Sequence, residues 1–531
     1  MKKITKLEII ILICIYLFGL YIWTLPFQDQ SIPYGEGDAT IHFFLASHMA
    51  INDKAMVVIP PYSAWMGLHN NPEFNPNFYL IYPPSMHTAL AIFQITNTDR
   101  IVGFYLFLAL MCSSVFFSLY ILMRYLYGPI VGLLSGFLIM FSMRDNLTFL
   151  WGQWGTGGGL AFIAILMYVY YKYTSSYIDN KEKPIYLYVF TILLVAQYLI
   201  HPLGCLILFS FLGVYTVLLF LKERKIPFKI KRMLGCILVF VVLIVLLAPF
   251  QALPILKRFD KNMGSTEELE PRTFYELAFD WYSVRGGLHG MPAFYYSFKN
   301  IYYGFWMLPI LIFGIISLLY YRGRRDLLLL GCVIGFYVIN HLDLIGIFLG
   351  SKRLRFYYYE SMIFYPIIAI GITRFANLFK SKKIIKYLIL VVFLVFVVLL
   401  NVKASYTHFD RAYDGVLRLN QVEMDGIAWI NDNVPDGKYI ALVGAPTEKQ
   451  QYWTESLTTE NIITYDPHKI MPQKDPDLNK STYLIIDYSF YYIYNDTNTI
   501  NVLSAWEEEN FPKERLIYNQ DNKYKVYKLE N

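Results

Sequence analysis

The sequence predicts a polytopic α-helical membrane protein with about eleven transmembrane helices and a small C-terminal α/β domain outside the membrane. Hydrophobic residues make up 56% of the 531 residues and charged residues only 16%, whereas soluble domains carry about 25% charged residues. Apolar runs recur along the first part of the chain at the length that a bilayer requires. Residues 403–531 are more polar and contain no such run.

A transmembrane helix needs about 20 predominantly apolar residues. The predicted spans cover residues 7–25, 101–123, 127–143, 157–174, 185–200, 203–221, 233–253, 302–321, 327–348, 359–379 and 384–402. The first span follows a basic N-terminus, as a signal peptide does. It is longer than a signal core of roughly 7–15 residues and no A-x-A cleavage site follows it, so we expect a retained helix.

The loops between these spans predict a cytoplasmic N-terminus, because Lys and Arg accumulate in cytoplasmic loops. The basic segments are 1–6, 124–126, 172–184, 222–232, 322–326 and 380–383. An odd number of spans then places residues 403–531 outside the cytoplasm. Glycosylation sequons begin at Asn146, Asn479 and Asn495, and all of them fall on the predicted outer side.

The cysteines exclude two classes of site. All of them lie in apolar segments, so they form neither a disulfide framework in the exposed domain nor a C-x-x-C metal site. They are Cys14, Cys112, Cys205, Cys236 and Cys332. The partners we expect are the bilayer and lipid-linked molecules, and not nucleic acid.

Two domains follow from this layout. Residues 1–402 form a transmembrane domain with long outer loops at 26–100 and 251–300, and residues 403–531 form the outer domain. Loops of this length are usually functional. The first is expected to contain amphipathic helices at 38–52 and 85–96.

The C-terminal domain is predicted to be α/β. A helix is expected at 422–433, a strand at 438–444, and a second strand within 481–493. Alternation of helix and strand over a segment of this length is typical of a small α/β domain.

The most informative polar segment opens the first outer loop. Glu36 and Asp38 are one residue apart between glycines, and His42 follows one turn after Asp38. Two such carboxylates can hold a divalent cation, or one can act as a base. The alternative is that Asp38 only caps an interfacial helix.

Further charged groups lie in other outer loops. Asp145 precedes an aromatic, glycine-rich stretch and could equally be a solvated loop residue. Lys352, Arg353 and Arg355 form a basic cluster on the side where the orientation rule disfavours Lys and Arg. Such a cluster suits a lipid phosphate, although a chance exception or contact with lipid head groups would also explain it.

At these residues the chain resembles the GT-C superfamily of membrane glycosyltransferases, which use sugars linked to a polyprenyl or dolichyl phosphate. Glu36-Gly-Asp38 matches the ExD form of the acidic motif in the first outer loop of that family. Tyr82-Pro-Pro84 with His87 resembles a segment of prokaryotic members. The family also has many spans, an inside N-terminus and often an outer C-terminal domain.

A second part of the resemblance is to the oligosaccharyltransferase catalytic subunit and its relatives. Trp429-Ile430 and the strand after it are similar to the start of their C-terminal domain, and Asp145 lies where they carry a second acidic motif. The chain departs from them in lacking a Trp-Trp-Asp motif. The nearest segment is Tyr452-Trp453-Thr-Glu455, which argues against transfer to Asn sequons.

The resemblance implies inverting transfer of a sugar from a polyprenyl-phosphate donor to an acceptor outside the membrane. Asp38 is the expected base, assisted by Glu36 and His42, and Lys352, Arg353 and Arg355 are expected to hold the lipid phosphate. The resemblance leaves open whether Asp38, Glu36 and Asp145 bind Mg²⁺ or Mn²⁺.

Two alternatives to an enzyme remain. One is a transporter or flippase of lipid-linked saccharides, for which Asn340, His341 and Asp343 form the main polar cluster within the spans. The other is a non-catalytic envelope assembly protein, which would leave Glu36-Gly-Asp38 unexplained.

Overall fold

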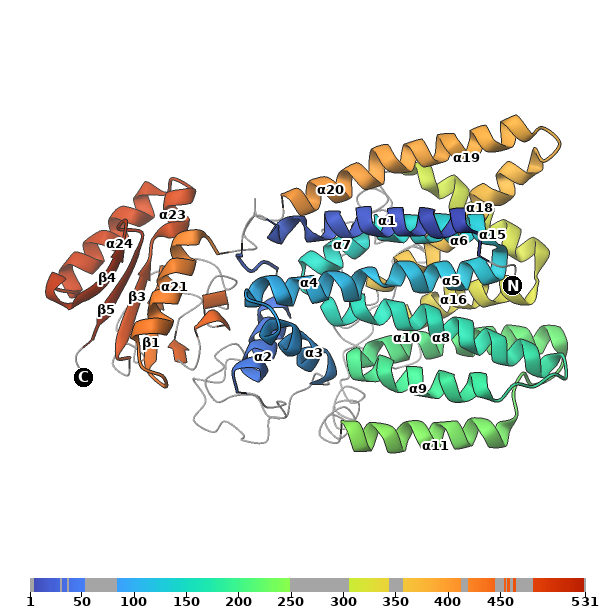
Figure 1. The fold of residues 1–531 in the computed structure, drawn as a ribbon, viewed down its shortest axis with the longest axis horizontal. Coiled ribbons are helices and arrows are strands. Elements are labelled where there is room, and N and C mark those ends of the chain that lie inside the picture. Colours follow the sequence, from blue (N-terminus) through green and yellow to red (C-terminus); the bar gives the residue numbers. More distant parts are fainter. Residues whose placement is uncertain are drawn as a thin grey trace, which may run out of the picture.

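The computed structural model describes most of the helices and the C-terminal strands (Figure 1). The described residues are 4–28, 31–35, 38–52, 84–248, 305–342, 357–411, 419–444, 453–454, 456–458, 462–464 and 481–529. Four predicted site residues, Glu36, Lys352, Arg353 and Arg355, lie outside them.

Most of the described helices run side by side in one bundle (Figure 1). The helical elements up to residue 410 are α1 (Lys6–Thr24), α2 (Asp38–Asn52), α3 (Pro84–Ile95), α4 (Arg100–Ser113), α5 (Val115–Tyr127), α6 (Pro129–Met140), α7 (Met143–Leu150), α8 (Trp154–Ile178), α9 (Ile185–Ile200), α10 (Pro202–Glu223), α11 (Ile230–Leu247), α15 (Leu308–Tyr321), α16 (Arg324–Asn340), η6 (Tyr357–Tyr359), α18 (Glu360–Leu378), α19 (Lys383–Val397), η7 (Val398–Val402) and α20 (Lys403–Asp410).

Within the described residues, seven helical segments are long and apolar enough to cross a membrane, and α6, α9 and α15 are shorter apolar helices. Each predicted span overlaps a described helix. The prediction of a helical membrane protein is therefore confirmed, while the number of eleven spans stays a prediction. The predicted loop helices are present as α2 and α3.

Small residues allow neighbouring helices of the bundle to approach closely. A Cβ added at Gly331 of α16 would lie 2.9 Å from Tyr215 Cα, and one at Gly335 would lie 2.8 Å from the Ser210 carbonyl oxygen. Ser210 Oγ donates to the Gly335 carbonyl at 2.6 Å. Backbone contact of this kind stabilises helix pairs in lipid, where apolar burial alone gives no driving force.

A five-stranded sheet forms what we call the C-terminal unit, from α21 to β5. Its elements are α21 (Gln421–Asn433), β1 (Tyr439–Val443), β2 (Ile462–Thr464), β3 (Tyr483–Asp487), α23 (Ser489–Ile493), α24 (Thr497–Asn510), β4 (Leu516–Gln520) and β5 (Tyr524–Lys528). The strand order is β2-β1-β3-β5-β4, with β1 parallel to β2 and β3, and β5 antiparallel to β3 and β4. The expected helix and both expected strands are present.

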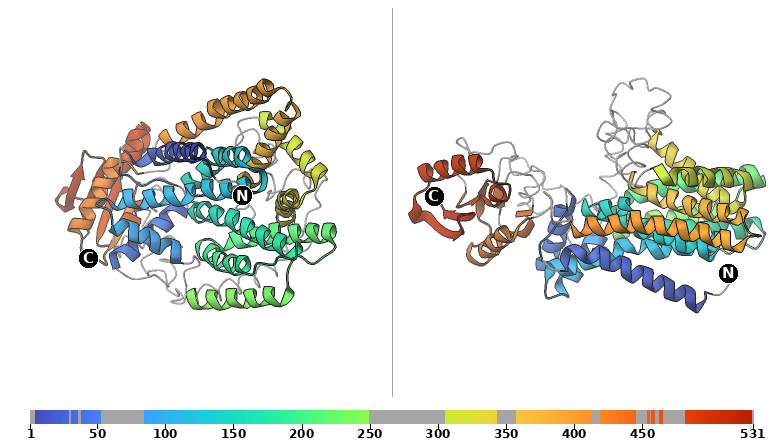
Figure 2. Two further views of the ribbon diagram at one scale, coloured as in Figure 1. Left: turned by 45° about the vertical axis from the view of Figure 1, so that its right-hand side comes forward. Right: turned by 90° about the horizontal axis from the view of Figure 1, so that it is seen from above.

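The central strand β3 is buried on both faces. Ile485 packs toward Ile430 of α21, whereas Leu484 packs toward Leu503 of α24. The C-terminal unit lies at one end of the bundle and the N-terminus at the other (Figures 1 and 2). The loop helices α2 and α3 lie between the bundle and the C-terminal unit (Figure 1).

A buried pair of carboxyl groups joins α21 to the sheet. Glu423 accepts a hydrogen bond from the Asn420 backbone at 2.6 Å, and Asp487 accepts from the Ser489 amide at 2.9 Å and its hydroxyl at 2.5 Å. Burial and the negative charge of Asp487 raise the pKa of Glu423 well above its usual range. The hydrogen bond between the two carboxyl groups also raises the pKa of Glu423, whereas it opposes the rise that burial causes in the pKa of Asp487, so the shared proton is held on Glu423.

Glu423→Gln is expected to make the stability of the C-terminal unit less dependent on pH. In the wild type the raised pKa gives full stability below the unfolded value of 4.5 and a loss as pH rises toward the folded value. The slope is about 1.4 kcal/mol per pH unit for one proton. Gln keeps both hydrogen bonds and cannot ionise. Thermal unfolding followed from pH 4 to pH 9 tests this, and parallel curves for the two proteins would contradict it.

Candidate functional site at the end of the bundle

The first turn of α2 is tied to the loop between α7 and α8. Gln153 Nε2 donates to Asp38 Oδ2 at 2.9 Å. The Gln153 backbone N–H donates to the Thr148 carbonyl at 2.9 Å, which holds this loop against α7. The helix starts at Asp38, as the sequence predicts, and its carboxylate is oriented by a residue from another part of the chain.

Two glycines make this close approach feasible. Gly152 has φ +71°, and a Cβ added there would lie 2.3 Å from the Ala39 backbone nitrogen. Gly35 has φ +126°, and its added Cβ would lie 2.6 Å from Ala39 Cβ. Both positions combine a backbone conformation that favours glycine with a contact that leaves no room for a side chain.

His42 lies one turn after Asp38 and joins α2 to α3. Its Nδ1 is 2.8 Å from Nε2 of His87, and both rings are buried. One of these nitrogens carries a hydrogen and donates it in a hydrogen bond, and the other nitrogen is the acceptor. The His42 ring also packs on Trp154, with centroids 5.8 Å apart. His42 is thus positioned between two helices rather than open to solvent.

Asp145 lies on α7 and is 3% exposed. Ser361 Oγ of α18 donates to Asp145 Oδ1 at 3.2 Å. A carboxylate buried at the end of a membrane bundle is costly to hold there. The reading of Asp145 as a solvated loop residue is therefore wrong.

The neighbouring Asn146 fixes α7 from its other side. Its Nδ2 donates to Ser405 Oγ of α20 at 2.5 Å, and both side chains are fully buried. Asn146 cannot be a glycosylation acceptor in the folded protein, so its sequon drops out of the topology argument. Asn495 is exposed, and Asn479 lies outside the described residues.

A second polar layer lies at the same end of the bundle. His201, at the junction of α9 and α10, has Nδ1 2.8 Å from the Tyr359 hydroxyl and Nε2 3.5 Å from Thr156 Oγ1. Gly155 leaves room for this imidazole, because its added Cβ would lie 3.2 Å from His201 Cδ2. Tyr359 immediately precedes Glu360, a fully buried acid at the start of α18.

Trp453 and Ser456 connect the C-terminal unit to α2 and the residues before it. Trp453 Nε1 donates to the Gly35 carbonyl at 3.2 Å, and Ser456 Oγ donates to the Thr40 carbonyl at 3.1 Å. The Trp453 ring is fully buried and meets Phe43 edge-on at 5.7 Å. The C-terminal unit therefore covers one side of the backbone around Asp38, at Gly35 and Thr40.

The described residues do not by themselves form a metal site. Among them, no three His, Cys, Asp or Glu side chains are grouped to hold an ion, and Glu36 lies outside these residues. Asp38 and Asp145 place two carboxylates at one end of the bundle.

The polar cluster that suggested transport makes two contacts with its own helix, while the buried Oδ1 of Asn340 has no hydrogen-bond partner among the described residues. Asn340 Nδ2 donates to the Phe336 carbonyl at 2.8 Å, and His341 Nδ1 lies 2.8 Å from the Tyr337 carbonyl. Asp343 lies outside the described residues. The two contacts are those of residues at the end of a helix.

No protein-family model and no curated protein sequence matches the chain. Solved structures are similar to it. AglB, the oligosaccharyltransferase of Archaeoglobus fulgidus in complex with an inhibitory peptide and a dolichol-phosphate, has a TM-score of 0.57 at 12% identity over 99% of this chain and 74% of that chain. The A. fulgidus enzyme in complex with Zn and sulfate has a TM-score of 0.54 at 14% identity, over 94% and 71%. ArnT from Cupriavidus metallidurans bound to undecaprenyl phosphate has a TM-score of 0.51 at 12% identity, over 97% of both chains.

The chain has a GT-C glycosyltransferase fold. This confirms the resemblance found in the sequence. At identities of 12–14% the similarity concerns the fold, so the activity has to be argued from the residues.

Several residues of the site in this GT-C fold were not predicted from the sequence. Gln153 and Ser361 orient the two aspartates, and His201 and Glu360 belong to the polar layer beside them. One signal could have revealed Glu360, because an isolated acid at the start of an apolar span is a candidate functional residue.

Proposed function

We propose that the protein is an inverting membrane glycosyltransferase that moves a sugar from a polyprenyl- or dolichyl-phosphate donor to an acceptor hydroxyl. The observation that carries the proposal is the pair of aspartates held at one end of a GT-C fold. Asp38 is oriented by Gln153 and Asp145 by Ser361. Aspartates that are held in a fixed orientation beside the C-terminal unit fit catalysis better than transport.

In the proposed reaction Asp38 takes the proton of the acceptor hydroxyl as that oxygen attacks the anomeric carbon. The bond from this carbon to the phosphate oxygen breaks on the opposite face, so the configuration inverts. Lys352, Arg353 and Arg355 would neutralise the leaving lipid phosphate. His42, which is hydrogen-bonded to His87, positions the helix that carries Asp38.

A divalent cation fits this proposal. Asp38, Asp145 and Glu36 would supply the oxygen ligands that Mg²⁺ and Mn²⁺ prefer. A neighbour of the same fold was solved with Zn. The cation would add positive charge next to the phosphate as the bond to the sugar breaks.

We also propose that the end of the bundle carrying the C-terminal unit faces away from the cytoplasm. The N-terminus lies at the opposite end, and the basic loops predict that it is cytoplasmic (Figure 1). The proposed division is a transmembrane domain at 1–402 and an outer domain at 403–531. AglB was solved with a dolichol-phosphate and ArnT with undecaprenyl phosphate, which supports a lipid-phosphate donor.

The direct test incubates the purified chain with polyprenyl-phosphate sugars and cell-envelope extract, followed by mass spectrometry. A sugar-mass increase on an envelope component, with release of polyprenyl phosphate, is the expected result. Movement of the lipid-linked sugar from one leaflet of a vesicle membrane to the other, without hydrolysis or transfer, would favour a flippase.

Gly152→Ala should lower transfer by about 10²-fold without preventing insertion, because the added methyl displaces the start of α2 and moves Asp38 away from Gln153. Transfer rates of purified variants test this. Gly437→Ala is the matched control, since Gly437 has a similar φ of +76° but no neighbour within 4 Å of the added Cβ. Equal losses in both variants would assign the effect to backbone strain alone.

A further inference from the structure

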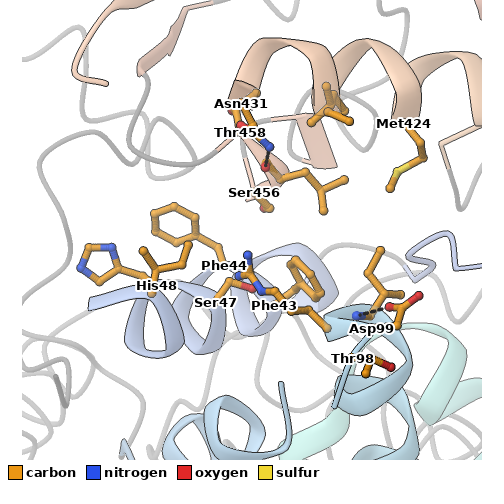
Figure 3. Close-up of a pocket in the computed structure, with 16 residues that line it drawn as sticks. Phe43, Phe44, Ser47, His48, Thr98, Asp99, Met424, Asn431, Ser456 and Thr458 are labelled. Carbon is orange, nitrogen blue, oxygen red and sulfur yellow. Dashed lines mark hydrogen bonds between the residues drawn. The ribbon is translucent and has the colours of Figure 1, made fainter. Parts of the chain in front are cut away.

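A groove of about 390 Å³ lies between the bundle and the C-terminal unit (Figure 3). One wall comes from α2 and the first residues of α4. The other wall comes from α21 and residues 456–458. Figure 3 shows Phe44 and His48 on one side, facing Asn431 and Ser456 on the other.

The groove lies on a different face of α2 from the proposed catalytic residues. Phe44, Ser47 and Ile51 line it, at helical spacing. Asp38 and His42 lie on the opposite face, since successive residues of an α-helix are about 100° apart. From Ser47 to Asp38 the helix rises by about 13 Å, at 1.5 Å per residue. The groove is therefore a separate site on the helix that carries the proposed base.

Arg100 gives the groove a positive charge. Its Nε donates to Gln94 Oε1 at 3.4 Å, and Ser47 Oγ donates to the same oxygen at 3.0 Å. No ion pair of Arg100 is found among the described residues. The carboxylate of Asp99 also lines the groove, and its negative charge is partly offset by the start of α4, where Asp99 Oδ1 accepts two backbone amides at 2.8 and 3.1 Å.

Apart from Arg100 and Asp99, the lining is uncharged and mixes hydroxyl, amide and apolar groups. Burial lowers the pKa of His48, which favours the neutral imidazole. Asn431 Nδ2 donates to the Leu457 carbonyl at 3.0 Å, which fixes the wall of the C-terminal unit. Phe44 and Met424 supply apolar surface, and Ser456 supplies a hydroxyl.

We propose that this groove binds an anionic saccharide, a sugar carrying a carboxylate or phosphate, as a part of the acceptor remote from the hydroxyl that reacts at Asp38. The guanidinium of Arg100 suits either anion, the hydroxyl and amide groups suit sugar hydroxyls, and the aromatic ring of Phe44 suits the apolar face of a sugar ring. The volume is that of a small ligand rather than of a protein segment. The inference rests on the proposed function, because it names the acceptor class for the same enzyme.

The test measures equilibrium binding of D-glucuronate and of its neutral counterpart D-glucose to the detergent-solubilised full chain by saturation-transfer NMR. Glucuronate should bind about tenfold or more tightly than glucose, as expected for one charge-assisted contact. Arg100→Gln should abolish this preference. Lys513→Gln, an exposed cation outside the groove, should retain it.

A second variant blocks the groove without removing charge. Ala428→Trp on the exposed side of α21 should weaken both sugars. Equal affinity for glucuronate and glucose in the wild type, or a preference that survives Arg100→Gln, would overturn the inference. A third outcome would also overturn it: phosphatidylglycerol vesicles bind in a way that depends on Arg100, and glucuronate does not bind. The groove would then hold a lipid head group.

These measurements do not depend on turnover. Asp38→Asn should bind glucuronate as the wild type does. Intact binding with no transfer in any assay would refute the proposed function alone. Transfer without an Arg100-dependent preference for the anionic sugar would refute the groove alone.

Discussion

Asp38→Asn is expected to lower sugar transfer by about 10²–10⁴-fold, the usual contribution of a general base. Asn keeps the shape of Asp, and its oxygen can still accept the hydrogen bond from Gln153. It also begins a helix about as well as Asp. The variant should insert and fold normally, so the loss isolates the negative charge. Initial rates with a polyprenyl-phosphate sugar measure it.

A matched control for this change is Asp496→Asn. Asp496 caps α24 and accepts the Thr499 amide at 3.1 Å, far from the proposed site. Its replacement should leave transfer unchanged, because Asn caps equally well. Near-normal transfer in Asp38→Asn would reduce Asp38 to a helix-start residue, and the base would have to be sought at Glu36 or Asp145.

Asp145→Asn is the second change with a large expected effect. Loss of a charge that binds a cation, or that acts directly on the reacting groups, removes several kcal/mol of transition-state stabilisation. At 1.36 kcal/mol per factor of ten, this is a loss of at least about 10²-fold. If a cation is involved, the Mn²⁺ concentration for half-maximal transfer should also rise. Titration of transfer with Mn²⁺ gives both quantities.

Ser361→Ala separates the carboxylate from its orientation. It removes the hydrogen bond to Asp145 Oδ1 but keeps the charge, so the expected loss is about tenfold. A loss equal to that of Asp145→Asn would mean that folding of α7, rather than the charge, had failed. Unchanged transfer in Asp145→Asn would confine the site to the first loop.

Local patterns predicted the helices of the site well. The start of α2 at Asp38 and of α3 near Pro84 follow from polar and proline residues before apolar periodic segments. The contacts between these elements could not be predicted. Asp38 accepts a hydrogen bond from Gln153, which lies 115 positions further along the chain. His42 contacts His87 only because α2 and α3 pack side by side.

Burial was the property that the sequence did not disclose. Asp145 and Asn146 belong to a polar tripeptide that is typical of an exposed loop, yet both side chains are enclosed by α18 and α20. The stretch that follows them is aromatic and glycine-rich. Only the folded structure shows what these glycines do: Gly152 allows close contact with α2, and Gly155 leaves room for His201.

The contacts from the C-terminal unit to the first loop have a consequence for how such proteins diversify. Trp453 and Ser456 donate to main-chain carbonyls of Gly35 and Thr40, which every amino acid possesses. These two hydrogen bonds therefore place few demands on the loop side chains, apart from the glycine at position 35 and the Phe43 ring that Trp453 meets. Other side chains of the loop can change without uncoupling the two halves of the molecule, provided that the backbone path is kept.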